Sequence, residues 1–288
     1  MTISQSKKVS VVVPNYNYGK YIKKRIKSIL KQTYPIYELI ILDDASTDKS
    51  VEEIKKIVDS LKIKKPELKI SFVQNKKNSG KAIAQWKKGF ELAKGDFVWI
   101  AEADDLCNRN FLAEVMKGFD DSEVAISYVE SAIINSAGLM IVPNFRWSRD
   151  KEKTGHFKKS YTKDGKREIE EIMAIRCTIP NVSAVVFRND KKYLKFLDEA
   201  MEFSQVGDWY FYVKILESGK IKYNKKSLNR FRIHKSSKTA NSKKDNAHYE
   251  EVLKMHEYFN KKYNLTKKIK EAMDVEVARI RARHGIIK

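Results

Sequence analysis

The chain has 288 residues, 42% of them hydrophobic, and a formal net charge of +21. This composition supports a full core and excludes an intrinsically disordered protein, and the length suits one large α/β domain with a small extension. No apolar run approaches the ~18–20 residues that span a bilayer, and the first ten residues lack the apolar stretch of a signal peptide. We therefore expect a cytoplasmic protein.

The positive charge is concentrated near the C-terminus. Residues 220–288 contain 20 Lys and Arg against 7 Asp and Glu. Such a segment favours an anionic partner, such as a membrane surface, a phosphate-bearing substrate or a nucleic acid. Alternatively, the lysines, which are scattered through the whole chain, only cover solvated faces. We expect no nucleic-acid partner, because the sequence contains no nucleic-acid recognition motif.

The first 105 residues alternate between predicted strands and predicted helices. Apolar runs rich in β-branched residues predict buried strands. Between these runs, apolar residues at helical spacing predict helices. The predicted strands are residues 9–13, 38–44, 69–75 and 96–105, and the predicted helices are residues 18–32, 48–61 and 82–93. This order indicates a parallel sheet covered by helices on both faces, which binds ligands at the carboxyl ends of its strands.

The pattern becomes less regular after residue 120. The charged segment 144–166 has little periodicity and predicts an exposed loop. The remaining expectations are one or two strands in 123–135, a strand at 181–188, a helix at 208–219, two short strands within 220–234, and two basic helices after residue 245 with a break near 264–266.

The predicted strand ends carry the polar or acidic segments PNYN, DDAST, QNKKNSG and EADD. A Rossmann dinucleotide site needs several glycines after the first strand, whereas the segment PNYNYGKY has one, and the sequence has no P-loop. DDAST also departs, at Ala45, from the D-x-D-x-T loop of phosphotransfer enzymes. These nucleotide-binding and phosphotransfer classes are therefore disfavoured.

The segment AEADDL, residues 101–106, places Glu102, Asp104 and Asp105 within four positions at the end of a predicted strand. Hard oxygen ligands at a strand end suit Mg²⁺ or Mn²⁺, either of which would also bind a diphosphate. Alternatively, Asp104 or Asp105 caps a helix that begins near Asn108.

Five segments follow one another between residues 9 and 120: VSVVVPNYN, SILKQTYP, ELIILDDASTD, NSGKAIAQWKKG and AKGDFVWIAEADD. In this order they strongly resemble the opening of the family 2 inverting glycosyltransferases, which have the GT-A fold. The later segments IPNVSAVVFR, GDWYFYVKIL and FRIHKSS resemble the branch of that family that assembles bacterial polysaccharides.

The resemblance implies an α/β fold, with a GT-A-like, Rossmann-type, mostly parallel sheet flanked by helices and a C-terminal helical extension. We expect a catalytic domain at residues 1–240, with a nucleotide-binding half at about 1–120 and an acceptor-binding half at about 121–240. Residues 241–288 then form the basic helical extension.

The resemblance also implies that a sugar moves, with inversion, from a nucleotide-diphosphate donor to a glycan or lipid-linked acceptor in cell-surface polysaccharide synthesis. A uridine donor fits best, although thymidine donors share the same base edge. The implied nucleotide-sugar contacts are Pro14, Tyr16, Asp44, Asn78, Lys81 and Asp104. The implied cofactor is Mn²⁺ or Mg²⁺, held by Asp105, Asp104 and His234.

Asp208 matches the family's general base, which takes the proton of the attacking acceptor hydroxyl. The alternative is that Asp208 only caps a helix. Its neighbour Trp209 either forms an acceptor wall or belongs to the core. The sequence departs from many relatives at Glu102, where they have Asp, and we expect Glu102 to support the site from behind the metal ligands.

Two other functions are considered for the same residues. A sugar-1-phosphate nucleotidyltransferase would need a glycine-rich loop after the first strand, which PNYNYGKY does not provide. A non-catalytic module that binds sugar nucleotides or polyanions would not depend on Asp208.

The two basic C-terminal helices have alternating apolar and cationic residues. They suit docking on an anionic membrane surface, where lipid-linked acceptors reside. Alternatively, they pack on the catalytic domain or form a dimer contact.

Overall fold

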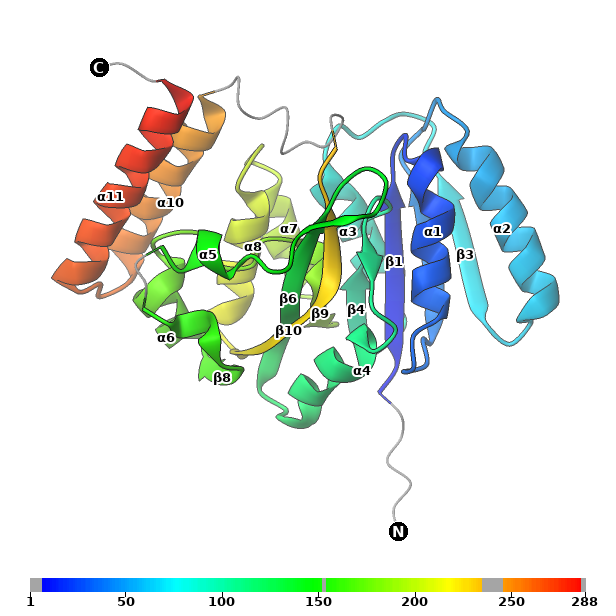
Figure 1. Ribbon diagram of the computed structural model, residues 1–288, viewed down its shortest axis with the longest axis horizontal. Coiled ribbons are helices and arrows are strands. Elements are labelled where there is room, and N and C mark those ends of the chain that lie inside the picture. Colours follow the sequence, from blue (N-terminus) through cyan, green and yellow to red (C-terminus); the bar gives the residue numbers. More distant parts are fainter. Residues whose placement is uncertain (1–6, 152–153, 235–245, 286–288) are drawn as a thin grey trace, which may run out of the picture.

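The computed structural model describes residues 7–151, 154–234 and 246–285 (Figure 1). Within these ranges no helix combines the length and apolar character required to cross a bilayer. The parallel strands of the N-terminal half run upward in Figure 1, so their carboxyl ends lie at the top of the molecule.

The N-terminal half has the alternating architecture that the sequence predicts. Its strands pair in parallel in the order β3-β2-β1-β4, and the helices between them cover the sheet. The elements are β1 (Val9–Asn15), α1 (Gly19–Leu30), β2 (Glu38–Asp43), α2 (Ser50–Lys64), β3 (Lys69–Gln74), α3 (Ala82–Leu92) and β4 (Phe97–Ile100). β4 ends at Ile100, so the expected strand over 96–105 is too long, and the acidic residues 102–105 form a turn.

The second half continues the same sheet in mixed orientation. After β4 the order is β9-β6-β10-β5, with β9 antiparallel to both of its neighbours and β10 parallel to β6. The strands are β5 (Leu106–Cys107), β6 (Val124–Ile134), β7 (Met140–Val142), β8 (Tyr161–Asp164), β9 (Val185–Arg188) and β10 (Lys220–Arg232). The main helices are α4 (Phe111–Met116), α7 (Tyr193–Ala200), α8 (Gly207–Leu216), α10 (Ala247–Lys262) and α11 (Lys267–His284).

Short helical turns complete this half. They are the α-turns α5 (Arg146–Arg149) and α6 (Gly165–Glu168), the 3₁₀ turns Lys117–Asp120, His156–Lys158 and Val182–Ala184, and the π-helical turn Ile169–Met173.

The core consists of two apolar layers, one on each face of the sheet. Successive side chains of a strand point to opposite faces, and in β1 Val11 and Val13 join one layer while Val12 joins the other. The first layer packs against α1, α2 and α4, and the second packs against α3, α7, α8 and α10. β1 is therefore buried on both faces, which explains its continuous apolar run.

The segment 144–166 is not the exposed loop that its charge predicts. It contains α5, a 3₁₀ turn and β8, and the side chains of Arg149 and Phe157 are buried. Arg149 donates hydrogen bonds to the buried Glu130 and, over 3.0 Å, to the carbonyl of Thr178. A partner distant in sequence thus explains the burial of this charge, and charge density alone was a misleading signal.

The two short strands expected within 220–234 are one strand, β10, of 13 residues. Its pairing with β6 shifts register at Asn224–Ser227 and again at Ser227–Asn229. These irregularities fall at the polar residues that the sequence indicates as a turn.

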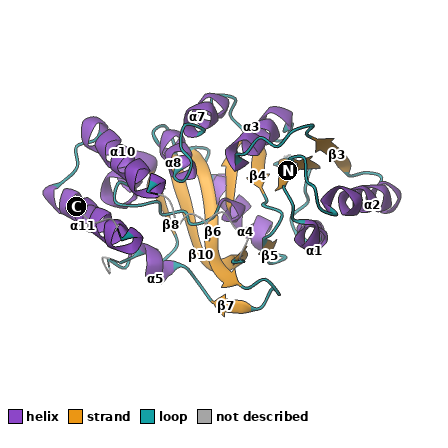
Figure 2. Cartoon of the chain, turned by 90° about the horizontal axis from the view of Figure 1, so that it is seen from above, coloured by secondary structure: helices purple, strands orange, loops and turns teal. Residues whose placement is uncertain are grey.

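The C-terminal helices pack on the rest of the described protein. The predicted break near 264–266 is confirmed, since α10 ends at Lys262 and Thr266 caps α11. Apolar side chains on their inner faces join the core, namely Val252, Met255, Phe259, Met273 and Ile280. Glu276 of α11 also accepts hydrogen bonds from Arg176 and Lys151, each over 2.9 Å. α10 and α11 lie at the opposite end of the molecule from α1 and α2 (Figure 2).

Candidate active site

The carboxyl ends of β1 and β2 are joined by a polar network. Asn15 donates to the Asp43 carboxylate over 2.8 Å, and the Ser46 hydroxyl donates to it over 2.6 Å. Pro14 lies within buried β1, whereas the Tyr16 side chain, which follows that strand, is 44% exposed. The rim therefore presents an aromatic side chain that a flat base could contact.

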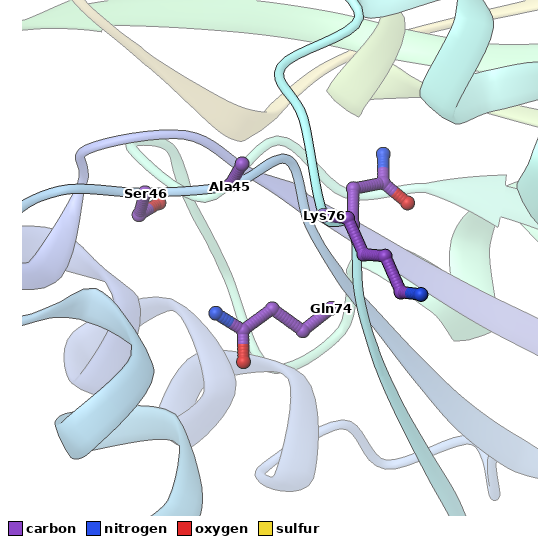
Figure 3. Close-up of a pocket in the computed structure, with 5 residues that line it drawn as sticks. Ala45, Ser46, Gln74 and Lys76 are labelled. Carbon is purple, nitrogen blue, oxygen red and sulfur yellow. The ribbon is translucent and has the colours of Figure 1, made fainter.

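An open pocket of about 510 Å³ lies beside this network, between the ends of β2 and β3 (Figure 3). It is lined by Ala45, Ser46, Gln74, Asn75 and Lys76. The pocket belongs to the Asp44 side of the rim, and its lining does not include the acidic turn that follows β4.

Asp44 holds the loop after β3 against the end of β2. Its carboxylate accepts hydrogen bonds from Asn75 over 2.7 Å, from the backbone and hydroxyl of Ser79 over 3.0 and 2.6 Å, and from Gln85 over 2.8 Å. Asn78 donates to the Asp44 carbonyl over 3.1 Å. A carboxylate offers about four acceptor positions, so much of the capacity of Asp44 is used within the protein. Its contact with a nucleotide base stays a prediction.

Lys81 links this loop to the second half of the protein. Its ammonium group donates a hydrogen bond to the carbonyl of Met201, which lies a few residues before α8. The predicted nucleotide-binding loop is thus attached to the segment that carries Asp208.

The acidic turn after β4 brings together side chains that are far apart in sequence. Asp104 Oδ2 lies 3.0 Å from His234 Nε2. Asp105 accepts hydrogen bonds from Asn181 over 3.0 Å and from the backbone N–H of Arg232 over 2.8 Å. Neither aspartate caps α4, whose N-cap residue is Asn110, so the helix-cap alternative for these aspartates is wrong.

Burial of this turn shifts the protonation of its acids. Burial, and next the neighbouring Asp104, raises the pKa of Glu102 to about 8 and that of Asp105 to about 7. Trp86 opposes the shift of Glu102 by donating its indole N–H over 2.7 Å. The Glu102 carboxylate is therefore hydrogen-bonded to Trp86, and its pKa is raised by the neighbouring carboxylates of Asp104 and Asp105.

Arg25 supplies part of the positive charge that this turn requires. Its guanidinium is fully buried, 5.0 Å from the Trp99 ring, and has no hydrogen-bond partner among the described residues. It lowers the pKa of both Glu102 and Asp105 against the effect of burial. This role could not be predicted from the sequence, because Arg25 occupies an ordinary position in a Lys-rich helix.

Asp208 lies in the first turn of α8 and is half-buried. It accepts the N–H of Trp209 over 2.8 Å, and burial raises its pKa to about 6. Asp208 and Glu102 both act on the buried Tyr212 hydroxyl, raising its pKa after the larger effect of burial. That Asp208 shares one site with the acidic turn stays a prediction.

Trp209 belongs to the core and does not form an acceptor wall. It is 2% exposed, donates to the Met173 carbonyl over 3.0 Å, and packs against Phe259 of α10 at 5.5 Å between ring centroids.

Glu251 of α10 fixes the chain just before α8. Its carboxylate accepts the backbone N–H groups of Ser204, Gln205 and Val206 over 2.7–3.1 Å, together with the Ser204 hydroxyl over 2.8 Å. A carboxylate that accepts several N–H groups is a strong local anchor. The sequence contains no signal for this contact, since Glu251 reads as one of many acids on an amphipathic helix.

Comparison with known proteins agrees with this geometry. Residues 10–178, more than half of the chain, match the sequence model of the glycosyl transferase family 2. The chain belongs to glycosyl transferase family 2. The match covers the strand-end rim, the acidic turn and the segment that leads to Asn181, and it ends before Asp208 and His234.

Relatives in family 2 align with less than half of this chain. Glycosyltransferase GlyG of Streptococcus pneumoniae serotype 4 is 33% identical over 121 residues, which cover 42% of this chain and 38% of GlyG. TarP of Staphylococcus aureus strain N315, a poly(ribitol-phosphate) beta-N-acetylglucosaminyltransferase, is 37% identical over 111 residues, 38% of this chain and 32% of TarP. The putative teichuronic acid biosynthesis glycosyltransferase TuaG of Bacillus subtilis strain 168 is 30% identical over 130 residues, 45% of this chain and 49% of TuaG. Each alignment spans less than half of the relative's length.

Solved structures confirm the expected fold over nearly the whole chain. TarS residues 1–349 of S. aureus, in complex with UDP-GlcNAc, superimpose with a TM-score of 0.65 at 20% identity, covering 96% of this chain and 72% of that one. The mannosyltransferase PcManGT of Pyrobaculum calidifontis, in complex with GDP-Man and Mn²⁺, gives a TM-score of 0.61 at 18% identity, covering 99% and 77%.

The carboxylate and imidazole groups at the acidic turn are chemically suited to part of the coordination shell of a divalent cation. Within the described ranges, no three His, Cys, Asp or Glu side chains gather as a complete metal site. Asp104 and His234 are adjacent and offer one carboxylate and one imidazole, which leaves positions for diphosphate oxygens and water. Asp105, also predicted as a ligand, already accepts two hydrogen bonds within the protein.

We predict that Glu251→Ala destabilises the protein by about 1–3 kcal/mol, because it leaves partly buried N–H groups without an acceptor. Denaturant unfolding followed by circular dichroism measures this change. Glu250→Ala, which removes an exposed neighbour on the same helix, is the matched control. Equal stability of the two variants would contradict the anchoring role of Glu251.

Proposed function

We propose that this family 2 protein is an inverting glycosyltransferase that uses a nucleotide-diphosphate sugar. Its acceptor is the hydroxyl of a glycan or lipid-linked molecule in cell-surface polysaccharide synthesis. The observation that carries this proposal is Asp208, a half-buried carboxyl whose raised pKa of about 6 suits a general base near neutral pH. The similarity to TarP, a poly(ribitol-phosphate) glycosyltransferase, and to TuaG, a putative teichuronic acid biosynthesis enzyme, supports the choice of a cell-surface polymer.

In the proposed reaction, the Asp208 carboxylate takes the proton of the acceptor hydroxyl as its oxygen attacks the anomeric carbon. The bond from that carbon to the diphosphate oxygen breaks on the opposite face, and the nucleoside diphosphate leaves with the bonding electrons. Configuration at the carbon inverts because attack and departure occur on opposite faces. The N–H of Trp209 holds the Asp208 carboxylate in place for this step.

The donor lies along the rim of the parallel strands in this proposal. Tyr16 contacts the base with its exposed ring, and Pro14 shapes the end of β1 behind it. Asn78 and Lys81 hold the loop that closes the base pocket against Asp44 and against the segment before α8. UDP is our first choice for the nucleotide, since the related TarS structure contains UDP-GlcNAc.

We assign the divalent cation, Mn²⁺ or Mg²⁺, to Asp104 and His234, with Asp105 orienting the turn through Asn181 and Arg232. When bound, the cation would neutralise negative charge that develops on the departing diphosphate. The complex of PcManGT with GDP-Man and Mn²⁺ supports a metal in a protein of this fold.

Asp208→Asn is expected to lower kcat by about 10²-fold or more while donor binding changes little, because the amide cannot accept the proton. Product formation and calorimetric titration with the donor measure the two quantities separately. Asp59→Asn, on the exposed face of α2, is the matched control. A non-catalytic binding module would show no turnover that depends on Asp208.

The pH dependence of kcat/KM should report the same carboxyl. Because the pKa of Asp208 is raised to about 6, the base is ionised above that pH and becomes protonated below it. The part of the profile that is due to Asp208 falls about tenfold per pH unit below pH ~6 and is level above it. A rate that stays constant from pH ~7 to ~5, in a range where the protein remains folded, would remove Asp208 from this role.

Removal of the metal should abolish sugar transfer, since the proposed site relies on a cation to offset the negative charge of the diphosphate. Nucleotide release from a panel of sugar nucleotides is measured with Mn²⁺ or Mg²⁺, with and without EDTA. Asp104→Asn should weaken Mn²⁺ binding in the presence of UDP by about 10–100-fold, followed by electron paramagnetic resonance. Asp105→Asn serves as the comparison, and metal-independent release would contradict the metal assignment.

A nucleotidyltransferase would instead consume a nucleoside triphosphate and release pyrophosphate.

A further inference from the structure

The hairpin formed by β6 and β7 carries three consecutive exposed apolar side chains. Leu139, Met140 and Ile141 are 68%, 60% and 57% exposed. A hydrogen-bonded turn closes the hairpin, with Asn135 N–H donating to the Leu139 carbonyl over 2.9 Å. Single exposed apolar residues are common, whereas a run of three at the end of a hairpin is a typical mark of an interaction surface.

The outer face of α1 is strongly cationic. Lys20, Lys23, Lys24 and Lys27 are exposed and follow the i, i+3, i+4, i+7 spacing of one helix face. The helix sequence, GKYIKKRIKSIL, contains no acidic residue. Within the described segments, none of these four ammonium groups forms an ion pair. We call this set of four lysines the lysine face.

The hairpin and the lysine face meet at a single pocket. A pocket of about 320 Å³ is lined by Lys20, Lys24 and Arg232 on one side and by Ser136 and Ala137 of the hairpin turn on the other. Figure 2 shows β7 at one edge of the molecule, away from α10. The turn that leads into the exposed apolar run thus lies beside two lysines of the lysine face.

We propose that this surface, the hairpin with the lysine face, docks the protein onto an anionic lipid bilayer. Apolar side chains would enter the boundary between headgroups and acyl chains, and the lysines would lie against anionic headgroups. A second copy of this chain fits less well, because two identical lysine faces repel each other across a symmetric interface. A nucleic acid would leave the apolar hairpin uncovered.

Docking on this surface would place the acidic turn close to the lipid. Arg232, which lines the pocket, donates its Nε–H to the Asp104 carbonyl over 2.5 Å, and the Tyr21 ring, which also lines the pocket, lies 5.2 Å from the His234 ring. A membrane-held acceptor would then reach the rim without leaving the bilayer. The docking itself does not depend on the proposed sugar transfer.

This assignment differs from the membrane contact expected of the C-terminal helices. Their inner faces are packed on the catalytic domain, and the exposed lysines of α11 lie at the opposite end of the molecule from α1. The two surfaces can therefore be tested against each other in one experiment.

The experiment is flotation of the full chain with vesicles of phosphatidylcholine, with or without about 30% phosphatidylglycerol. We expect the protein to float with the anionic vesicles alone and to be released at about 0.5 M salt. One variant replaces the lysine face (K20Q/K23Q/K24Q/K27Q), and another replaces the hairpin residues (L139S/M140S/I141S). Each should weaken binding by at least about tenfold, since each lysine near an anionic surface contributes roughly fivefold.

Matched controls carry the same kinds of change elsewhere. Ile63→Ser removes an apolar side chain that is 82% exposed on α2, and K267Q/K268Q/K270Q removes three exposed lysines of α11. Both controls should float like the original protein, and circular dichroism checks that every variant is folded. The proposal is overturned if the original protein does not float, if the α11 control alone loses binding, or if the hairpin variant only abolishes a dimer seen by sedimentation.

Discussion

The structure depends on how one short turn holds its negative charge. Glu102, Asp104 and Asp105 follow a buried strand, and charges there are costly unless other groups compensate them. The buried guanidinium of Arg25 supplies positive charge, and the backbone N–H of Arg232 donates a hydrogen bond to Asp105. The protein alone does not complete this compensation, because the pKa values of Glu102 and Asp105 remain high.

The second half of the sheet supplies part of this compensation. β10 runs parallel to β6 and brings Arg232 and His234 to Asp105 and Asp104, 127 and 130 residues later in the chain. The strand-end rim of the first half is therefore incomplete until the second half folds onto it. A donor diphosphate and its cation would find one side of their site in each half.

Much of the N-terminal half could be predicted, because its signals are local. Continuous β-branched runs such as Val9–Val13 indicate strands buried on both faces, and the alternation of strands with helices implies parallel pairing. The carboxyl ends of such strands meet at one edge, so the rim that contains Asp44 and Asp104 follows from the order of elements alone.

The remainder depends on contacts between residues far apart in sequence. The burial of Arg149 requires Glu130 on another element, and nothing near Arg149 in the chain signals that partner. The same holds for Arg25, a cation within a helix of surface lysines, and for the continuous strand β10, whose polar centre resembles a turn. Such sites are set by tertiary pairing, which periodicity and charge density do not report.

The C-terminal helices illustrate how a basic segment can serve the site without touching its ligands. Glu251 holds the three N–H groups that precede α8, and Phe259 packs on Trp209, the residue next to Asp208. α10 therefore limits the movement of the first turn of α8 from two directions. In the function that we propose, Asp208 must stay within hydrogen-bond reach of the acceptor hydroxyl, and small displacements of that turn would break this condition. The inner face of α10 thus supports the turn that carries Asp208, through the Glu251 carboxylate and the Phe259 ring.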